Sequence, residues 1–205
     1  MKGWMIVLPI VILSLSLPAS DQMEYAKTQK DIVVIETDFG NIEFALFIDV
    51  APKNGKNIIK LVGEGFYNGV TFHRVIPDFV IQGGDPNTRD DDPSNDGYGG
   101  PGYYIKDEIT QDLHHLIGTV AMAKAKPDEN GSQFYICLGR LKSLDGKYTI
   151  IGQVISGMET VNKIALVETD RNDRPLKNVV MNKVHMKEKE EKSEKENNEE
   201  KPKTQ

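Results

Sequence analysis

The chain has 205 residues, of which 39% are hydrophobic, 27% charged and 7% aromatic, and its formal net charge is −6. This length predicts one main domain. The apolar content excludes a wholly disordered chain, and the charge content excludes a protein with many membrane spans. A single cysteine excludes an intramolecular disulfide and any zinc site that needs two thiolates. The negative charge argues against generic binding to nucleic acid or anionic lipid.

Residues 1–20 differ in composition from the rest of the chain. Lys2 precedes an apolar run, and small residues follow up to Ser20. This order is typical of a secretory signal peptide that is cut after Ala19 or Ser20. An uncleaved signal anchor is the open alternative, because the residues before these two sites suit cleavage poorly. The sequence therefore predicts an exported protein, secreted or membrane-anchored, with a polar linker over 21–30.

Residues 31–186 have the pattern of one globular unit rich in strands. Alternating apolar residues over 42–48 follow a β-branched run over 32–35, and the Gly-containing turn between them predicts a hairpin. Helices are predicted over 52–62, where a proline opens the first turn, and over 157–166. Further strands are predicted over 71–76, 79–82, 119–122, 133–138, 149–154 and 179–186.

The C-terminal segment, 187–205, consists almost entirely of Lys, Glu, Asn and Ser. It holds six Lys against seven Glu and has no apolar residue to bury. This composition predicts a charged disordered tail. Docking to a partner is the alternative to plain solvation, which we favour because mixed charges are usually solvated.

Several short motifs match the patterns of known binding sites, but the residues around them do not fit those sites. Residues 97–102 satisfy G-x-G-x-x-G, but no strand precedes them and a proline lies inside, which excludes a dinucleotide site. Residues 92–97 resemble the start of a calcium loop, but Tyr103 stands where a bidentate glutamate is required. His114 and His115 would point to opposite faces of a strand and would not easily chelate one ion. We therefore expect no metal.

The segment over 72–85, FHRVIPDFVIQGGD, carries an arginine within an apolar stretch. Strand alternation places His73 and Arg74 on opposite sides of one strand. A buried ion-pair network would give Arg74 a purely structural role, but no acid lies at a neighbouring strand position in this segment. Because a buried, unpaired guanidinium is costly, we expect Arg74 to line a cleft.

Three further segments accompany it, namely AMAKA at 121–125, NGSQFYI at 130–136 and LDGKYTIIGQV at 144–154. In type, order and spacing, the four segments resemble the cyclophilins, a family of peptidyl-prolyl cis/trans isomerases, and the resemblance covers 31–186. It implies an all-β fold with two helices, in which a closed eight-stranded antiparallel β-barrel carries a helix at each end. It also implies a shallow substrate groove on the outer face of the barrel and no cofactor.

The resemblance also implies roles for individual residues. Arg74 matches the donor that stabilises the prolyl nitrogen as the amide twists, and His73 matches a residue at the edge of the groove. With Phe79 and Gln82 they form the expected catalytic set. The expected substrate-binding residues, which form the proline pocket or hold the peptide, are Val80, Ala123, Lys124, Gln133, Tyr135, Leu144 and Tyr148.

The central catalytic residues of the family are intact, so we expect isomerase activity. The other positions resemble bacterial or archaeal members more than eukaryotic ones. Departures from many eukaryotic members are Ser143 for Trp, Tyr148 for His, Lys124 for Asn, Tyr135 for Phe and Val80 for Met.

The sequence thus predicts an isomerase that accelerates rotation about X–Pro bonds in exported proteins during folding. Its expected partners are proline-containing peptides and unfolded or folding proteins. The altered pocket and the charged tail support an alternative, a non-enzymatic peptide-binding module or holdase chaperone that uses the same groove. We expect a monomer that binds no nucleic acid and contacts membranes only if the N-terminal anchor is retained.

Overall fold

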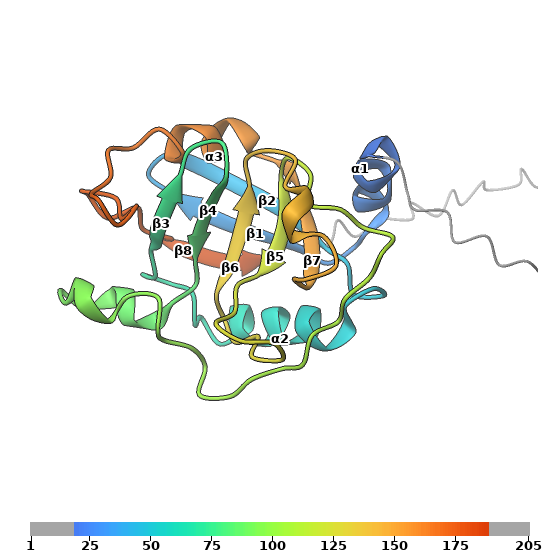
Figure 1. Cartoon of the computed structure of the whole chain (residues 1–205), viewed down its shortest axis with the longest axis horizontal. Helices are drawn as coiled ribbons and strands as arrows, with labels where there is room; N and C mark the ends of the chain where they lie inside the picture. The colour runs from blue at the N-terminus through green and yellow to red at the C-terminus, as the bar shows by residue number, and fades with distance from the viewer. Residues whose placement is uncertain (1–18, 189–205) are drawn as a thin grey trace, which may run out of the picture.

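The computed structural model describes residues 19–188 and places most of them in one curled antiparallel sheet with helices around it (Figure 1). The strand order is β3-β4-β6-β5-β7-β2-β1-β8. In Figure 1, β1, β2 and β8 cross behind β3, β4, β6 and β5, so the two halves of the sheet enclose the core. The strands are β1 (Ile32–Thr37), β2 (Gly40–Leu46), β3 (Phe72–Ile76), β4 (Val80–Gly83), β5 (Thr119–Met122), β6 (Phe134–Cys137), β7 (Ile150–Ser156) and β8 (Lys183–Met186).

The predicted N-terminal hairpin is present as β1 and β2. Thr37 faces Gly40 at its tip, where the Thr37 hydroxyl donates to the Gly40 carbonyl at 2.8 Å and accepts from the amide of Phe39 at 3.1 Å. Gly40 has a φ of +124°, a conformation that side chains disfavour. The turn therefore fixes the register of the hairpin.

Apolar side chains from both halves of the sheet form the main core. Phe134 of β6 lies at its centre, with ring centroids 5.8 Å from Tyr67 and 6.3 Å from Phe72 in edge-on geometry. Phe44 of β2 lies 6.1 Å away from Phe134 on the opposite half of the sheet. These rings join strands that are distant in sequence, and their burial is the main apolar contribution to stability.

The prediction of a closed barrel is wrong, because β3 and β8 do not pair along their length. The two edges meet at one end, where the Phe72 amide donates to the Val179 carbonyl at 2.9 Å and Thr71 bridges to Val180. Farther along β3, the amide of Val75 donates at 2.8 Å to the carbonyl of Asp173. A loop thus occupies the edge that β8 would need, and the sheet is an open half-barrel.

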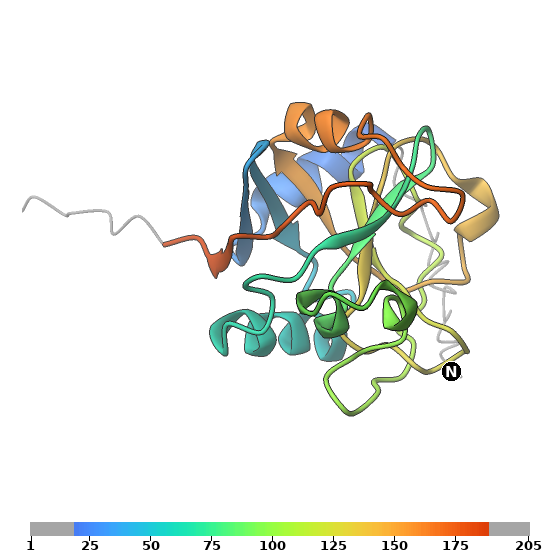
Figure 2. The same cartoon turned by 90° about the vertical axis from the view of Figure 1, so that its left-hand side faces the viewer.

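Residues 19–188 contain three α-helices, where the sequence predicts two. Helices α2 (Pro52–Gly63) and α3 (Met158–Ile164) lie at opposite ends of the sheet, and Figure 2 shows α2 below it and α3 above it. Helix α1 (Ala19–Thr28) covers most of the predicted linker and packs against β7 and β2. The 3₁₀ helices are η1 (Pro86–Arg89), η2 (Pro93–Asn95) and η3 (Lys142–Leu144).

The third helix, α1, forms because its buried residues pack against the sheet, and its local sequence alone does not predict it. Gln22 and Ala26 of α1 are fully buried against the sheet, although the segment is polar overall.

Within residues 19–188, no helix combines the length and apolar character that a membrane span requires. The predicted signal segment falls almost entirely on residues 1–18, and the predicted tail on 189–205; both lie outside the described part of the chain.

Gly157 lies at the start of α3, and replacing it tests how tightly α3 packs against the β1–β2 hairpin. Its φ is +87°, and a Cβ there would lie 2.1 Å from the Asn41 carbonyl oxygen. We expect Gly157→Ala to lower the free energy of unfolding by about 3 kcal/mol, from backbone strain and the clash together. Urea unfolding followed by circular dichroism measures the change.

The matched control is Gly63→Ala at the end of α2. A Cβ at Gly63 meets nothing within 4 Å, so we expect no loss and a gain of up to about 1 kcal/mol from helix propensity. Equal losses for both variants would contradict the assignment of strain to Gly157.

Candidate functional site

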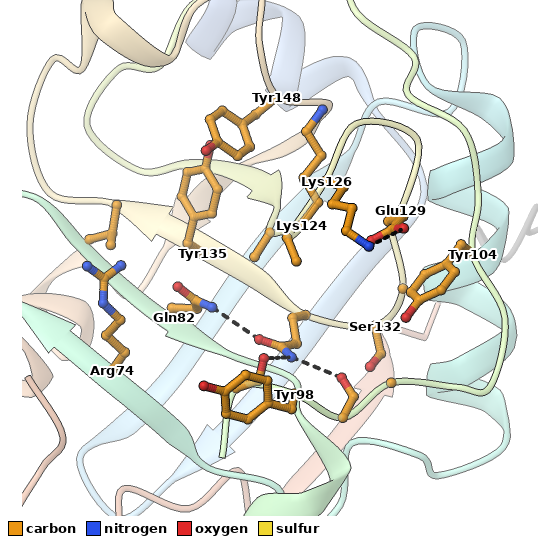
Figure 3. A pocket seen from close by; sticks show the side chains of 18 of the residues that line it. Arg74, Gln82, Tyr98, Tyr104, Lys124, Lys126, Glu129, Ser132, Tyr135 and Tyr148 are labelled. Atoms are coloured by element: carbon orange, nitrogen blue, oxygen red, sulfur yellow. Dashed lines mark hydrogen bonds and ion pairs between the residues drawn. The ribbon is translucent and has the colours of Figure 1, made fainter. Parts of the chain in front are cut away.

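A groove of about 470 Å³ lies on the outer face of β3, β4, β6 and β5 (Figure 3). It brings together residues from several separate stretches of the sequence, between Arg74 and Tyr148. One wall carries Arg74 and Gln82, and the other side carries Lys126, Glu129 and Tyr104. The groove contains every predicted site residue except His73, namely Arg74, Phe79, Val80, Gln82, Ala123, Lys124, Gln133, Tyr135, Leu144 and Tyr148.

Arg74 extends from β3 and is half-exposed. Its Nε lies 3.7 Å from Asp173 Oδ2, and both side chains remain more than a third exposed. This acid comes from a loop about a hundred residues farther along the chain, so its proximity was not visible in the strand segment. The loose pair keeps the guanidinium at the rim of the groove, with donors left to face a ligand.

Gln82 and Gln133 connect the strands to a glycine-rich loop. The side-chain amide of Gln82 donates to Gln133 Oε1 at 3.1 Å, and Gln133 Nε2 donates to the carbonyls of Gly97 and Gly99 at 2.9 Å each. Tyr98, between these two glycines, is 86% exposed and lines the groove. The chain of amides therefore holds the 97–100 loop as a wall of the groove.

The sequence analysis missed this loop as part of the site. Its glycine pattern is conspicuous in the sequence, but it was interpreted only as a failed dinucleotide-binding motif. Gly99 has no room for a side chain, since a Cβ there would lie 2.0 Å from Asp85 Oδ1. Asp85, fully buried, accepts from the amide of Gly99 at 3.1 Å and from that of Gly97. The glycines thus allow the loop to fold closely over a buried carboxylate.

His73 does not line the groove. It is 8% exposed and lies under the glycine-rich loop, 3.9 Å from the Cβ position of Gly97, where the pairing of β3 with β4 is irregular. Neither ring nitrogen has a hydrogen-bond partner among the described residues. Burial lowers the pKa of His73, with the Asp85 charge acting in the opposite direction.

The side chain of Lys124 turns away from the open groove. Its ammonium bonds to Asp107 and lies 5.4 Å from the centroid of the Tyr148 ring, and the side chain is 8% exposed. Burial alone would raise the pKa of Asp107, but hydrogen bonds from Lys124 and from the amide of Asp128 lower it overall. This pair ties the 105–108 segment to the rim, and the main chain of Lys124 remains beside the groove.

Aromatic rings form the floor near Leu144. The Tyr135 ring meets Tyr148 edge-on at 5.9 Å, and the Tyr135 hydroxyl lies 3.0 Å from His115 Nε2. His115 Nδ1 lies 3.0 Å from Asp145 Oδ1. Burial raises the pKa of Tyr135 and lowers the pKa of His115. Arg140 and His115 hold the pKa of Asp145 at about 2, although burial acts against them.

The two adjacent histidines do not point apart as the strand interpretation required. They lie in a loop, and both reach the same carboxylate: His114 Nδ1 is 3.3 Å and His115 Nδ1 3.0 Å from Asp145 oxygens. No set of three metal-ligating side chains gathers anywhere in residues 19–188. Cys137 is buried in β6, where burial raises the pKa of its thiol to about 12 and suppresses reactivity.

A family model for "cyclophilin type peptidyl-prolyl cis-trans isomerase/CLD" matches residues 32–186. The chain belongs to the cyclophilin family. Peptidyl-prolyl cis-trans isomerase ppi1 of Schizosaccharomyces pombe is 46% identical over 148 residues, which cover 70% of this chain and 91% of that protein. Human peptidyl-prolyl cis-trans isomerase-like 1 is 45% identical over 151 residues, 72% of this chain and 87% of the relative.

A solved cyclophilin-type isomerase from Cryptosporidium parvum, crystallised in the presence of the dipeptide Ala-Pro, has the same fold. Its TM-score is 0.71 at 35% identity, and the match covers 77% of this chain and 99% of that one. The chain described here is therefore a peptidyl-prolyl cis-trans isomerase of the cyclophilin type.

Two expectations about this cyclophilin are corrected. The likeness to bacterial or archaeal members is wrong, since the relatives named here are eukaryotic, as are others from plants and fungi. The prediction of an exported protein is overturned as well. The match covers 91% of the S. pombe relative, which leaves too few residues there for a counterpart of residues 1–20.

Two buried histidines lead us to expect that this cyclophilin loses stability in acid. The pKa values of His73 and His115 are lowered, chiefly by burial. In the unfolded chain, histidine titrates near ~6.5, so below that pH the unfolded state takes up protons before the folded state does. We expect the melting temperature to fall as the pH is lowered from about 7.5 to about 5.

The His73→Asn variant should show a smaller fall over the same range, because one of the two histidines is gone. Thermal unfolding at several pH values, followed by circular dichroism, checks both expectations. A measurement at about pH 8, where histidines are neutral in both states, gives each variant its own baseline. A wild-type melting temperature that stays flat or rises on acidification would contradict the assignment.

Proposed function

We propose that the groove binds a peptide with its proline ring over the aromatic floor and its X–Pro amide beside Arg74. The observation that carries the proposal is the meeting of a half-exposed guanidinium and an apolar pocket in one groove. The C. parvum neighbour, crystallised in the presence of Ala-Pro, supports a proline-containing substrate. Phe79, Val80, Tyr135, Leu144 and Tyr148 supply the pocket for the ring.

The chemical problem is rotation about a conjugated bond. Amide resonance sets a barrier of about 18–20 kcal/mol, and uncatalysed X–Pro exchange takes tens to hundreds of seconds. No covalent bond has to form or break. The enzyme needs only to bind the twisted amide more tightly than either planar isomer.

Arg74 is the group that we assign to this discrimination. When the amide twists, the prolyl nitrogen regains a lone pair that the planar isomers have delocalised into the carbonyl. A guanidinium N–H directed at that nitrogen gains a hydrogen bond only in the twisted state. The weak pair with Asp173 orients the side chain without burying it, so its donors stay available to the substrate.

The remaining residues hold the peptide in place. Gln82 lies between Arg74 and Tyr135 on the strands, and its bond to Gln133 fixes its amide. The main chain at Ala123 lies at the same wall, where its amide donates to the Gln133 carbonyl at 2.9 Å. Since the Lys124 side chain is bound to Asp107, we assign to Lys124 a main-chain role only.

The same groove fits segments of unfolded or folding proteins. It is open along its length, and it carries polar side chains such as Arg74 and Gln82 beside a pocket of aromatic and apolar side chains. A short extended peptide with one proline matches this arrangement, because its ring is apolar and its main chain is polar. We therefore propose folding chains that expose X–Pro bonds as the substrates, with no resident cofactor in the reaction.

Arg74→Ala is the direct test. We expect kcat/KM for a short Ala-Pro peptide, measured by NMR exchange, to fall about a hundredfold or more, because the variant loses a donor used in the transition state. The side chain is 41% exposed, so we expect the melting temperature to change little.

The matched control is Arg171→Ala, which removes an exposed arginine from the loop that also carries Asp173. We expect it to retain the wild-type rate. Retention of the full rate by Arg74→Ala would exclude Arg74 as the donor. A folded wild-type protein that binds the peptide without accelerating exchange would instead favour a peptide-binding module.

A further inference from the structure

We propose that Gln22 of helix α1 is a positioning residue for the proline pocket, acting through the loop of His114 and His115. Helix α1 precedes the residues that match the family, which begin at 32, so the family's own site does not include it. The inference rests on the proposed use of the groove. It adds to that groove a support from outside the residues that match the family.

The side-chain amide of Gln22 is held in place by hydrogen bonds. Its side chain is fully buried, and its Oε1 accepts from the amide of His114 at 3.0 Å. Its Nε2 lies 3.1 Å from the carbonyl of His114 and 3.0 Å from Thr119 Oγ1. One side-chain amide thus pairs with both main-chain groups of a single residue, as a neighbouring strand would.

Burial of α1 alone does not require a glutamine at this position. Ala26 is fully buried on the same helix, and the Tyr25 ring packs against Phe47 with centroids 4.9 Å apart. These contacts account for apolar docking of α1. A buried amide costs free energy unless its hydrogen bonds are made, so Gln22 adds a specific geometry rather than more apolar area.

The next step runs from His114 to the walls of the groove. His115 follows directly in sequence, and its amide donates to Asp145 Oδ1 at 2.8 Å while its carbonyl accepts from the Leu141 amide at 2.8 Å. Leu144, which lines the groove, lies between Leu141 and Asp145. The placement of the 114–115 main chain therefore sets the placement of this wall.

The His115 ring reaches the floor itself. Its Nε2 lies 3.0 Å from the Tyr135 hydroxyl, and its ring stacks on Tyr135 with centroids 6.0 Å apart. It also meets Tyr148 edge-on at 6.5 Å. Figure 3 shows Tyr135 and Tyr148 beside each other at this side of the groove. A continuous set of contacts thus joins Gln22 to both tyrosines.

Gln22→Met in the full-length chain tests the proposal, because methionine keeps the volume and helix propensity but forms none of the amide bonds. A looser pocket wall weakens binding of planar and twisted proline alike. We expect KM for an Ala-Pro peptide to rise about three- to tenfold, with kcat within about twofold of wild type. The matched control is Glu24→Met, which changes an exposed residue of the same helix and should leave both constants unchanged.

A double-mutant cycle with Tyr135→Phe separates positioning from general stability. This variant removes the hydroxyl at the end of the path and keeps the ring. If Gln22 acts through that path, Gln22→Met should change KM less than about twofold in the Tyr135→Phe background. An equal rise in KM in both backgrounds would overturn the route through the Tyr135 hydroxyl, and a Gln22→Met enzyme with wild-type constants would overturn the proposal as a whole.

Should Gln22→Met fail to fold, Gln22→Asn replaces it in the same cycle, since it keeps the amide but withdraws it by one methylene. The rise in KM is then expected to be smaller and still to depend on Tyr135. The absence of any acceleration by the wild-type chain would defeat the proposed function instead. That outcome is distinct from an active wild type whose KM is insensitive to Gln22.

Discussion

The cross-strand register of β3, β4 and β6 is the constraint on which the site depends. Arg74 pairs with Gln82, and Gln82 pairs with Tyr135, so one row across three strands presents a donor, an amide and an aromatic ring on the same outer face. A slip of one residue in any of these strands would turn that strand's member of the row into the core. The interior side chains Val75, Ile81 and Ile136 prevent this slip by filling the core. Packing of the core therefore determines the chemistry of the surface.

The sequence was most informative where local pattern and local contacts agree. The β1–β2 hairpin, the strand of Arg74 and the groove segments were predicted from spacing and from family resemblance. The sequence did not predict the features that depend on contacts between segments far apart in the chain. The loop of Asp173 takes the β3 edge and leaves the barrel open, and packing against the sheet turns a polar stretch into α1. His114 and His115 converge on one carboxylate because they lie in a loop, which alternation arguments do not describe.

Three of the five departures from common family residues, Lys124, Tyr135 and Tyr148, form a connected group. Lys124 bonds to Asp107 beneath the Tyr148 ring, and Tyr148 in turn packs on Tyr135, whose hydroxyl reaches His115. Each side chain is polar and larger than a simple apolar filler, yet each finds a partner, as buried polar groups must. At position 135, a reversion to Phe would remove the hydroxyl that lies 3.0 Å from His115 Nε2. These positions are therefore best considered as one unit.

The burial of Cys137 has a consequence for kinetics. It is the single cysteine in the chain and lies in β6, between two hydrogen-bonded neighbours near the middle of the sheet. Its side chain shares the outer face of the sheet with that of Tyr135, in a cluster with Leu113, so a thiol-directed reagent reaches it only when the segments that cover this face move away. With excess reagent, the labelling rate then follows how often these covering segments open. The protein thus carries a built-in reporter of its own opening motions that requires no engineered probe.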